Sequence, residues 1–156
     1  MTDRDPLALE EQVCFALAVA SREVVAAYRS VLEPLGLTHP QYLVMLALWQ
    51  HATADDGTGL SVKELSGLLH LDPGTLSPLV KRLESAGLVS RRRSARDERL
   101  LVIDVTDDGL ALRERALAVP TTMLTRLGMS EADLTATNDV LHRIIDAAAK
   151  NESVTP

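Results

Sequence analysis

The segment from Lys81 to Arg99 constrains the fold most, because it concentrates basic side chains in an otherwise acidic chain. It carries seven basic and three acidic residues, a net charge of +4, whereas the whole chain has a net charge of −6. The surrounding sequence predicts a helix that stops at Gly87, then two short strands, Val89–Arg93 and Arg99–Val105, joined by an arginine-rich turn. A basic cluster on a helix and a hairpin is the electrostatic signature of a phosphate-binding surface, which predicts contact with a DNA duplex.

Two short helices are predicted immediately before this hairpin. Ser61 and Glu64 have the spacing of a capping box for a helix over Val62–Leu69. Asp72 followed by Pro73 is typical of the start of the next helix. Two short helices, a turn and a basic strand pair make a winged helix–turn–helix, so the expected fold is mainly α with a small β-hairpin wing.

Long helices are predicted on both sides of this lobe. Apolar residues recur at steps of three and four from Leu7 to Leu35, the pattern of a helix that packs on another helix. A helix is expected from Thr38 through Trp49, and the polar stretch 51–59 predicts a loop. Two further helices are expected over about 107–127 and 131–150.

The second helix of a helix–turn–helix places its N-terminal side chains in the major groove, and arginine reads guanine well because its planar fork matches two acceptors. The turn Ser94–Arg99 is expected to reach the minor groove, where arginine is favoured, with Asp97 holding the Arg99 guanidinium. An arginine-rich strand edge could alternatively only resist aggregation, but the upstream helix–turn–helix favours DNA contact. The predicted DNA-binding residues are Thr75, Ser77, Lys81, Arg82, Arg91, Arg93, Arg96, Asp97 and Arg99.

Length and composition narrow the class of protein. A chain of 156 residues with 46% hydrophobic content suits one domain, and its four aromatic residues predict an aliphatic core. It has neither a secretory signal pattern nor a run of about 18 apolar residues, so a cytoplasmic protein with no membrane partner is expected. A single cysteine, Cys14, allows no intrachain disulfide and gives no metal-ligand spacing, so neither a metal nor another cofactor is expected.

Cys14 lies on the apolar stripe of the first helix. A lone cysteine in such a place is more often a small core residue than a reactive thiol, and the residues alone leave both interpretations open. Tyr28 lies on the same stripe, about 21 Å further along a helix that rises 1.5 Å per residue. A contact between this phenol and this sulfur would therefore require a second chain, with the two helices antiparallel about a twofold axis.

The predicted helix–turn–helix, its wing and the cysteine-bearing first helix together resemble the MarR family of winged-helix repressors. Within that family they resemble the organic-hydroperoxide-sensing subgroup. The resemblance runs from about Leu9 to Ala148, and the wing's Asp97-x-Arg99 is typical of the broad family. The Cys-Phe pair in the first helix, followed by Pro-Gln-Tyr in the second, is typical of the subgroup. The stretches that carry the resemblance are LEEQVCFALAVASRE (9–23), YRSVLEPLGLTHPQYLVMLALW (28–49), LHLDPGTLSPLVKRLESAGLVSRRR (69–93) and DER (97–99).

The resemblance implies a single MarR-type domain over 1–156 that forms a homodimer. Its dimerisation helices would be about 7–35 and 107–150, and its DNA-binding lobe about 40–105. Such a repressor binds an inverted-repeat operator in double-stranded DNA while reduced. An organic hydroperoxide oxidises the sensing cysteine, here Cys14, to sulfenic acid, and the repressor then releases DNA. Because the chain has no other cysteine, a low-molecular-weight thiol is the implied resolving partner.

The chain departs from the subgroup at three positions. His39 stands where the subgroup usually has one of two tyrosines that bond the sensing sulfur across the dimer, while the other tyrosine is kept as Tyr28. Ala18 replaces a second aromatic one turn after the cysteine, and Pro73 replaces a serine at the start of the recognition helix. His39 can still donate a hydrogen bond, so Cys14, Tyr28 and His39 are the expected redox-sensing residues.

Two alternative functions would give Cys14 a different role. One is a MarR-type repressor released by a small aromatic or lipophilic ligand in the dimer cleft, with Cys14 purely structural. The other is a thiol peroxidase, which the sequence does not support, because position 11 is Glu rather than a peroxide-orienting Thr and no resolving cysteine exists. No motif surrounds any histidine, and His51 and His70 are expected on surface loops or helix ends. The expected protein is therefore not an enzyme.

Overall fold

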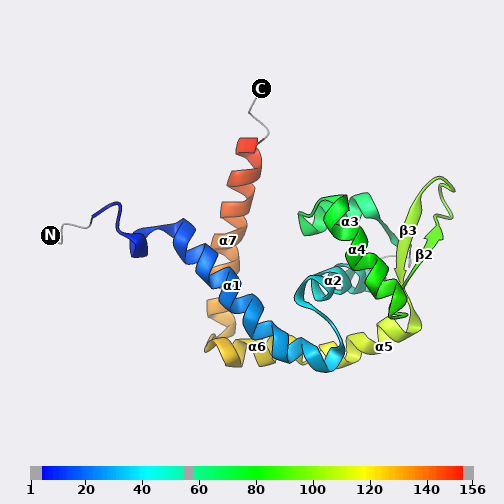
Figure 1. Ribbon diagram of the computed structural model, residues 1–156, viewed down its shortest axis with the longest axis horizontal. Helices are drawn as coiled ribbons and strands as arrows, with labels where there is room; N and C mark the ends of the chain where they lie inside the picture. Colours follow the sequence, from blue (N-terminus) through cyan, green and yellow to red (C-terminus); the bar gives the residue numbers. More distant parts are fainter. Residues whose placement is uncertain (1–4, 55–57, 153–156) are drawn as a thin grey trace. The chain divides into compact units, whose positions relative to one another are not determined.

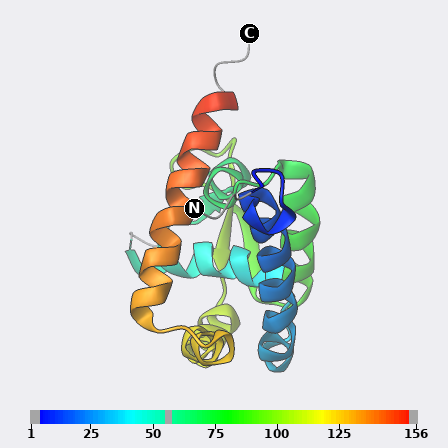
Figure 2. The same ribbon diagram turned by 90° about the vertical axis from the view of Figure 1, so that its left-hand side faces the viewer.

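The computed structural model describes residues 5–54 and 58–152, and it is mainly helical with one small sheet (Figure 1 and Figure 2). The chain divides into two units, of which the first contains all elements through α5 and the second contains α6 and α7. In chain order the elements are η1 (Leu9–Glu11), α1 (Val13–Leu32), η2 (Glu33–Leu35), α2 (His39–Ala54), β1 (Leu60–Ser61), α3 (Val62–Leu69), α4 (Pro73–Ser85), β2 (Val89–Arg93), β3 (Leu101–Val105), α5 (Asp107–Ala116), α6 (Val119–Leu127) and α7 (Glu131–Glu152).

The helix–turn–helix forms where its local signals predicted it. The Glu64 carboxylate accepts a hydrogen bond from the Ser61 backbone N–H at 2.7 Å, and the Ser61 hydroxyl accepts one from the Glu64 N–H, which completes the capping box of α3. His70 ends α3 in the left-handed conformation. Asp72 then caps α4, which stops just before the left-handed Gly87. These local bonds orient α4 as the second helix of the motif.

The wing is an antiparallel hairpin of β2 and β3, in which Val89 pairs with Val105 and Arg93 with Leu101. Both predicted strands form, although β3 begins at Leu101 rather than at Arg99. The sheet also has a third strand, β1, on the other edge of β3. The predicted loop over 51–59 is wrong in its first part, because α2 continues to Ala54. Residues 55–57 of that loop lie outside the described residues.

The core of the first unit is mostly aliphatic, as predicted, and it holds the lobe together. Its largest fully buried side chains include Leu32, Met45, Leu65, Leu76, Leu83 and Ile103. Trp49 Nε1 donates to the backbone oxygen of Gly109 at 2.9 Å, which ties α2 to α5. A Cβ at Gly109 would lie 2.2 Å from the backbone oxygen of Leu88, so only glycine fits this close approach.

Two long helices differ from their predictions. The first begins at Val13 rather than near Leu7, because Gln12 is extended and a short 3-10 turn precedes it. The helix expected over 107–127 is broken into α5 and α6. Pro120, which cannot donate a backbone N–H to the carbonyl four residues earlier, lies in the first turn of α6. The last helix is continuous from Glu131, and the Ser130 hydroxyl caps it by accepting a hydrogen bond from the Asp133 backbone N–H at 3.1 Å.

Candidate DNA interface and candidate redox site

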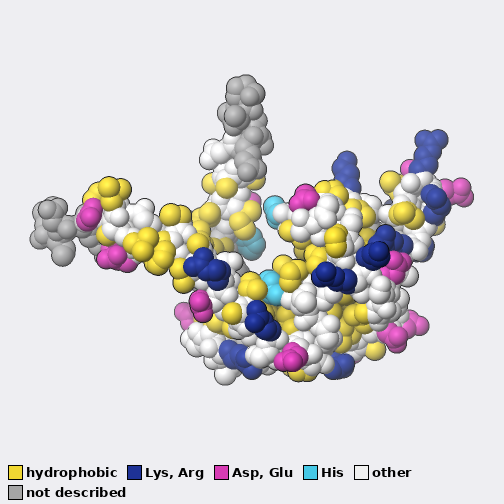
Figure 3. Space-filling model, viewed as in Figure 1, with side chains coloured by type: hydrophobic (Ala, Val, Ile, Leu, Met, Phe, Trp, Pro, Cys, Tyr) yellow, Lys and Arg dark blue, Asp and Glu magenta, His cyan; other side chains and the backbone are white. Residues whose placement is uncertain are grey.

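Helix α4 exposes the four side chains predicted to contact DNA. Leu76, Val80 and Leu83 are buried on one face, so α4 is anchored to the lobe through this stripe. The opposite surface carries the predicted residues, all of them exposed: Thr75, Ser77, Lys81 and Arg82. In the space-filling view, lysine and arginine side chains gather over α4 and the hairpin (Figure 3).

The hydroxyls of Thr75 and Ser77 are hydrogen-bonded to the start of α4. Thr75 Oγ1 donates to Asp72 Oδ2 at 2.7 Å, and this bond, with one from the Thr75 backbone N–H, holds the pKa of the Asp72 carboxyl below its usual range. Ser77 Oγ donates to the Pro73 carbonyl oxygen at 2.8 Å. The two hydroxyl oxygens keep acceptor capacity, and their side chains stay close to the helix surface.

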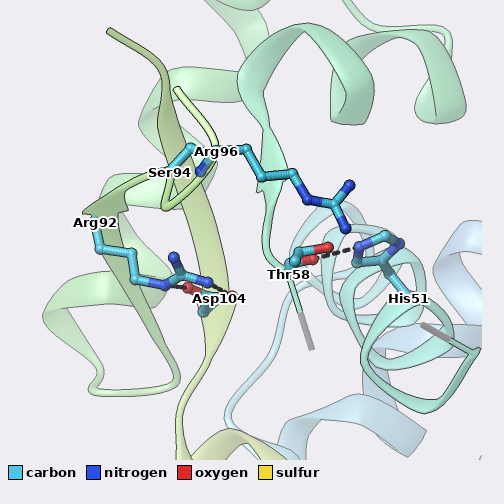
Figure 4. Close-up of polar contacts among 6 residues, drawn as sticks. All are labelled: His51, Thr58, Arg92, Ser94, Arg96 and Asp104. Atoms are coloured by element: carbon cyan, nitrogen blue, oxygen red, sulfur yellow. Dashed lines mark hydrogen bonds and ion pairs between the residues drawn. The ribbon is translucent and has the colours of Figure 1, made fainter. Parts of the chain in front are cut away.

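The three arginines of β2 have intramolecular partners. Arg91 Nε lies 3.2 Å from Glu84 Oε2, an ion pair that joins β2 to α4. Arg93 Nη1 donates to the Glu98 backbone oxygen at 2.8 Å, across the turn of the hairpin. Arg92 faces the other way and pairs with Asp104 (Figure 4). In this structure the predicted DNA contacts of Arg91 and Arg93 therefore compete with internal bonds.

The tip of the wing is ordered by short-range bonds. Asp97 Oδ1 accepts a hydrogen bond from the Arg99 backbone N–H at 3.0 Å, so the carboxylate holds the backbone of Arg99, where a contact with its guanidinium was expected. The Arg96 side chain points back toward Thr58, whose carbonyl oxygen is in contact with His51 Nε2 (Figure 4). Arg96 and Thr58 both line a cavity of about 220 Å³.

The structure brings together two of the three predicted redox residues. The Tyr28 ring, on α1, has its centroid 5.1 Å from that of His39 and 5.9 Å from that of Tyr42, both on α2. Cys14 is exposed in the first turn of α1, about 21 Å from Tyr28 along that helix. The phenol and the sulfur therefore do not meet within one chain. Sequence reasoning did not assign Tyr42 to this cluster, although it is part of the Pro-Gln-Tyr motif.

Burial decides the charge state of the ring cluster. It raises the pKa of the Tyr28 and Tyr42 phenols, and Tyr28 raises that of Tyr42 further. The same burial lowers the pKa of His39. Near pH 7 the cluster is therefore uncharged, and it can offer phenolic O–H groups and one imidazole N–H as hydrogen-bond donors.

A cleft of about 560 Å³ opens beside His39. It is lined by Val25 and Arg29 of α1, by Glu33, and by the turn from Gly36 to Pro40. Residue patterning did not identify Arg29 and Glu33 as lining residues, because they become neighbours of His39 only when α1 and α2 pack together. Among the described residues no group of three or more potential ligands could hold a metal ion. In the same part of the chain, no helix has the length and apolar character needed to span a bilayer.

A winged helix–turn–helix with a basic recognition face defines a DNA-binding regulator. Residues 26–115 match the family model "Transcriptional regulator SarA/Rot". The chain is 41% identical, over 91% of its length and 92% of the relative's, to the organic hydroperoxide resistance transcriptional regulator of Bacillus subtilis. It belongs to the MarR family of transcriptional regulators, in the subgroup of this relative.

Two solved structures share the fold. AbfR of Staphylococcus epidermidis, in its reduced form bound to DNA, is 29% identical, with a TM-score of 0.67 over 91% of this chain and 98% of that one. CouR of Rhodococcus jostii, bound to p-coumaroyl-CoA, is 27% identical, with a TM-score of 0.75 over 88% of this chain and 94% of that one. The predicted winged-helix fold is therefore confirmed.

Proposed function

We propose that this protein is a dimeric transcriptional repressor that holds an inverted-repeat operator while Cys14 is reduced and releases it when an organic hydroperoxide oxidises that thiol. One observation carries the proposal. The only cysteine of a chain 41% identical to an organic hydroperoxide resistance regulator is exposed in the first turn of a long helix. The protein acts in the cytoplasm as a regulator, and its oxidation is a single stoichiometric event, not catalysis.

The proposed DNA contacts come from α4 and from the wing. The N-terminal half of α4 enters the major groove with Thr75 and Ser77 close to the base edges, while Lys81 and Arg82 bind phosphate or guanine. The wing places basic side chains over the minor groove. On binding, Arg91 and Arg93 exchange their bonds to Glu84 and the Glu98 carbonyl for contacts with phosphate. The wing contacts come from Arg91, Arg93, Arg96 and Arg99, with Asp97 ordering the turn.

The sensing step is a two-electron oxidation. The Cys14 sulfur attacks the terminal oxygen of the hydroperoxide, the O–O bond breaks, and the corresponding alcohol leaves. The cysteine keeps one oxygen as sulfenic acid. A low-molecular-weight thiol then condenses with it, forming a mixed disulfide and releasing water.

The dimer completes the sensing site. Two α1 helices that run antiparallel bring Cys14 of one protomer to Tyr28 and His39 of the partner subunit. The uncharged phenol and imidazole donate hydrogen bonds to the sulfur. A bulky addition at the sulfur would separate these helices and change the spacing of the two lobes. The exposed apolar side chains of α1 and of α7, such as Val25 and Ile144, form the dimer contacts.

DNA release provides the test. Reduced protein bound to fluorescent operator DNA is titrated with cumene hydroperoxide, in parallel with the Cys14→Ser variant. We expect the wild type to release DNA and the variant to stay bound. Retention by both would contradict peroxide sensing, and release of both would show that the oxidant acts elsewhere.

A second candidate function rests on the cleft beside His39. It is large enough for a small ligand, and CouR, which shares the fold, was solved with p-coumaroyl-CoA. In this alternative an aromatic or lipophilic ligand releases DNA and Cys14 is structural. The Cys14→Ser protein would then respond to the ligand as the wild type does.

A further inference from the structure

An apolar groove between α2 and α3 has no role in the function proposed above. Its volume is about 410 Å³, and its lining includes Leu43, Leu46, Ala47 and Gln50 from α2 and Leu68 and Leu69 from α3. Leu46 is 40% exposed and Leu68 is 60% exposed. Adjacent exposed leucines on a lobe that also carries the DNA-reading helix indicate a surface that another segment covers.

The segment before α1 also exposes apolar side chains, which could cover such a groove. Leu7 is 85% exposed, Leu9 59% and Val13 64%, although all three are large apolar side chains. This N-terminal arm, residues 5–13, has a defined conformation. The Gln12 side-chain amide donates to the Pro6 carbonyl oxygen at 2.7 Å and to that of Ala8 at 3.2 Å. An ordered arm that presents its leucines outward is prepared to bind an apolar groove without a large loss of conformational entropy.

The dimensions of the arm and the groove agree. If Cys14 lies at His39 of the partner subunit, the arm begins at one end of the partner's α2. Leu43 and Leu46 lie about 6 and 11 Å from His39 along that helix. Leu9 lies about 10 Å from Cys14 when the intervening residues follow a 3-10 and helical path, and Leu7 lies a few ångströms further. The two leucines can therefore reach the groove.

The charges are also compatible. The arm carries Asp5, Glu10 and Glu11 and no basic residue, whereas the described lining of the groove has no carboxylate. His51 lines one end of the groove, and His70 follows Leu69 at the end of α3. Among the described residues that line the groove, none would repel the acidic arm.

We propose that the N-terminal arm of each protomer packs into the α2–α3 groove of its partner, with Leu7 and Leu9 as the anchoring side chains. This proposal rests on the proposed function only in placing Cys14 beside His39 of the partner subunit. Because α3 is the first helix of the DNA-reading motif, a displacement of the arm acts directly on that motif. The arm then links the oxidised cysteine to the lobe of the other subunit.

Site-directed cross-linking tests this contact. In the full-length Cys14→Ser chain, Leu9→Cys is combined with Leu68→Cys, and Leu7→Cys with Leu46→Cys, and each protein is treated with a short bis-maleimide. We expect a covalent dimer as the main product of at least one pair, with peptide mapping joining the two substituted positions. The single-cysteine variants and Leu9→Cys with Leu101→Cys, on the exposed wing, should give little dimer.

Three results would overturn the proposal: dimer no more abundant than in the single variants, a link formed within one chain, or efficient linkage of Leu68→Cys to Ile145→Cys, which would place α7 in the groove. The cross-link needs no sulfur at position 14, so it is independent of peroxide sensing. A failed cross-link with intact Cys14-dependent DNA release refutes only the arm contact. A successful cross-link without such release refutes only the sensing mechanism.

Discussion

At the residue scale, His39 is the most consequential position in the chain. The centroid of its ring lies 5.1 Å from that of Tyr28, with the two rings tilted by 55°. The ring also lines the cleft, and burial lowers the pKa of His39. A neutral imidazole donates one hydrogen bond, as a phenol does, so His39 can serve in place of the tyrosine usual at this position. A charged imidazole would bring a positive charge to the proposed sensing site, and because burial lowers the pKa of His39, this charge forms only in more acidic solution.

Stability should therefore depend on pH through His39. Because its pKa is lower in the folded state, the unfolded chain binds the proton first, and the free energy of unfolding should fall as pH drops below about 6.5. The decrease continues until the folded-state pKa is passed. Urea unfolding of the wild type and of His39→Gln measures this effect between about pH 7.5 and 5, the range in which histidine usually titrates. The variant should show the shallower loss, and identical pH profiles would contradict the prediction.

The close approach at Gly109 predicts a strong and local stability effect. In Gly109→Ala the new methyl group would meet the Leu88 backbone oxygen, so we expect a loss of about 1–3 kcal/mol in the free energy of unfolding. Gly67→Ala is the matched control, because that exposed helical glycine has no atom near its Cβ position and alanine favours helix. Equal stability of the two variants in thermal or urea unfolding would show that α5 can shift without cost.

At the element scale, the wing and α4 form one unit. The Arg91–Glu84 pair joins them, and the Asp97 bond to the Arg99 backbone shapes the tip. The wing therefore presents its basic side chains at a defined position relative to the recognition helix. Both elements belong to the first unit of the chain.

Replacing Arg99 by alanine should weaken DNA binding broadly across sequences. If Arg99 contacts one phosphate, the slope of log affinity against log salt should become shallower by about 0.9. Fluorescence anisotropy at several salt concentrations gives this slope. Arg113→Ala, on α5 outside the wing, should leave it unchanged, and an unchanged slope for Arg99→Ala would remove Arg99 from the phosphate contacts.

The helices and strands also show which features of the fold the sequence predicts and which it does not. Ser61, Asp72 and Gly87 predicted their helix ends correctly, because caps and left-handed stops are set by bonds among neighbouring residues. Strand β1 was missed, since two residues form a strand only by pairing with β3, far along the chain. The single helix predicted over 107–127 is broken near Pro120, because proline cannot donate the backbone hydrogen bond that continues a helix. The internal partners of Arg91 and Arg93 depend on the exact placement of the hairpin, which charge counting does not provide.

At the scale of the whole molecule, α1 and α7 each present large apolar side chains to solvent in the described chain. Val13 and Val25 on α1, and Val140, Ile144 and Ile145 on α7, are too exposed for a monomer with a complete core. A second copy that covers these faces accounts for both. The proposed sensing site, which needs Cys14 of one protomer and Tyr28 of the partner subunit, requires the same homodimer.

A charge on the apolar face of α7 should disrupt this dimer. Ile144→Asp buries a carboxylate without a partner in the interface, so we expect monomeric or insoluble protein in light scattering after gel filtration. Thr135→Asp, on the opposite face of the same helix, is the control and should remain dimeric. A folded, soluble dimer of Ile144→Asp would refute the role of α7 in dimerisation.

Peroxide sensing through Cys14 is tested most directly by comparing the intact mass of DNA-bound protein with that of released protein. Operator-bound protein is treated with less than one equivalent of cumene hydroperoxide in the presence of a small thiol. The DNA-bound and released fractions are then separated, and the protein in each is analysed by intact mass spectrometry. Peroxide sensing through Cys14 predicts that released dimers carry one added oxygen or one mixed disulfide, located at Cys14, and that bound dimers remain reduced. Released protein with unmodified Cys14, or bound protein with oxidised Cys14, would contradict it.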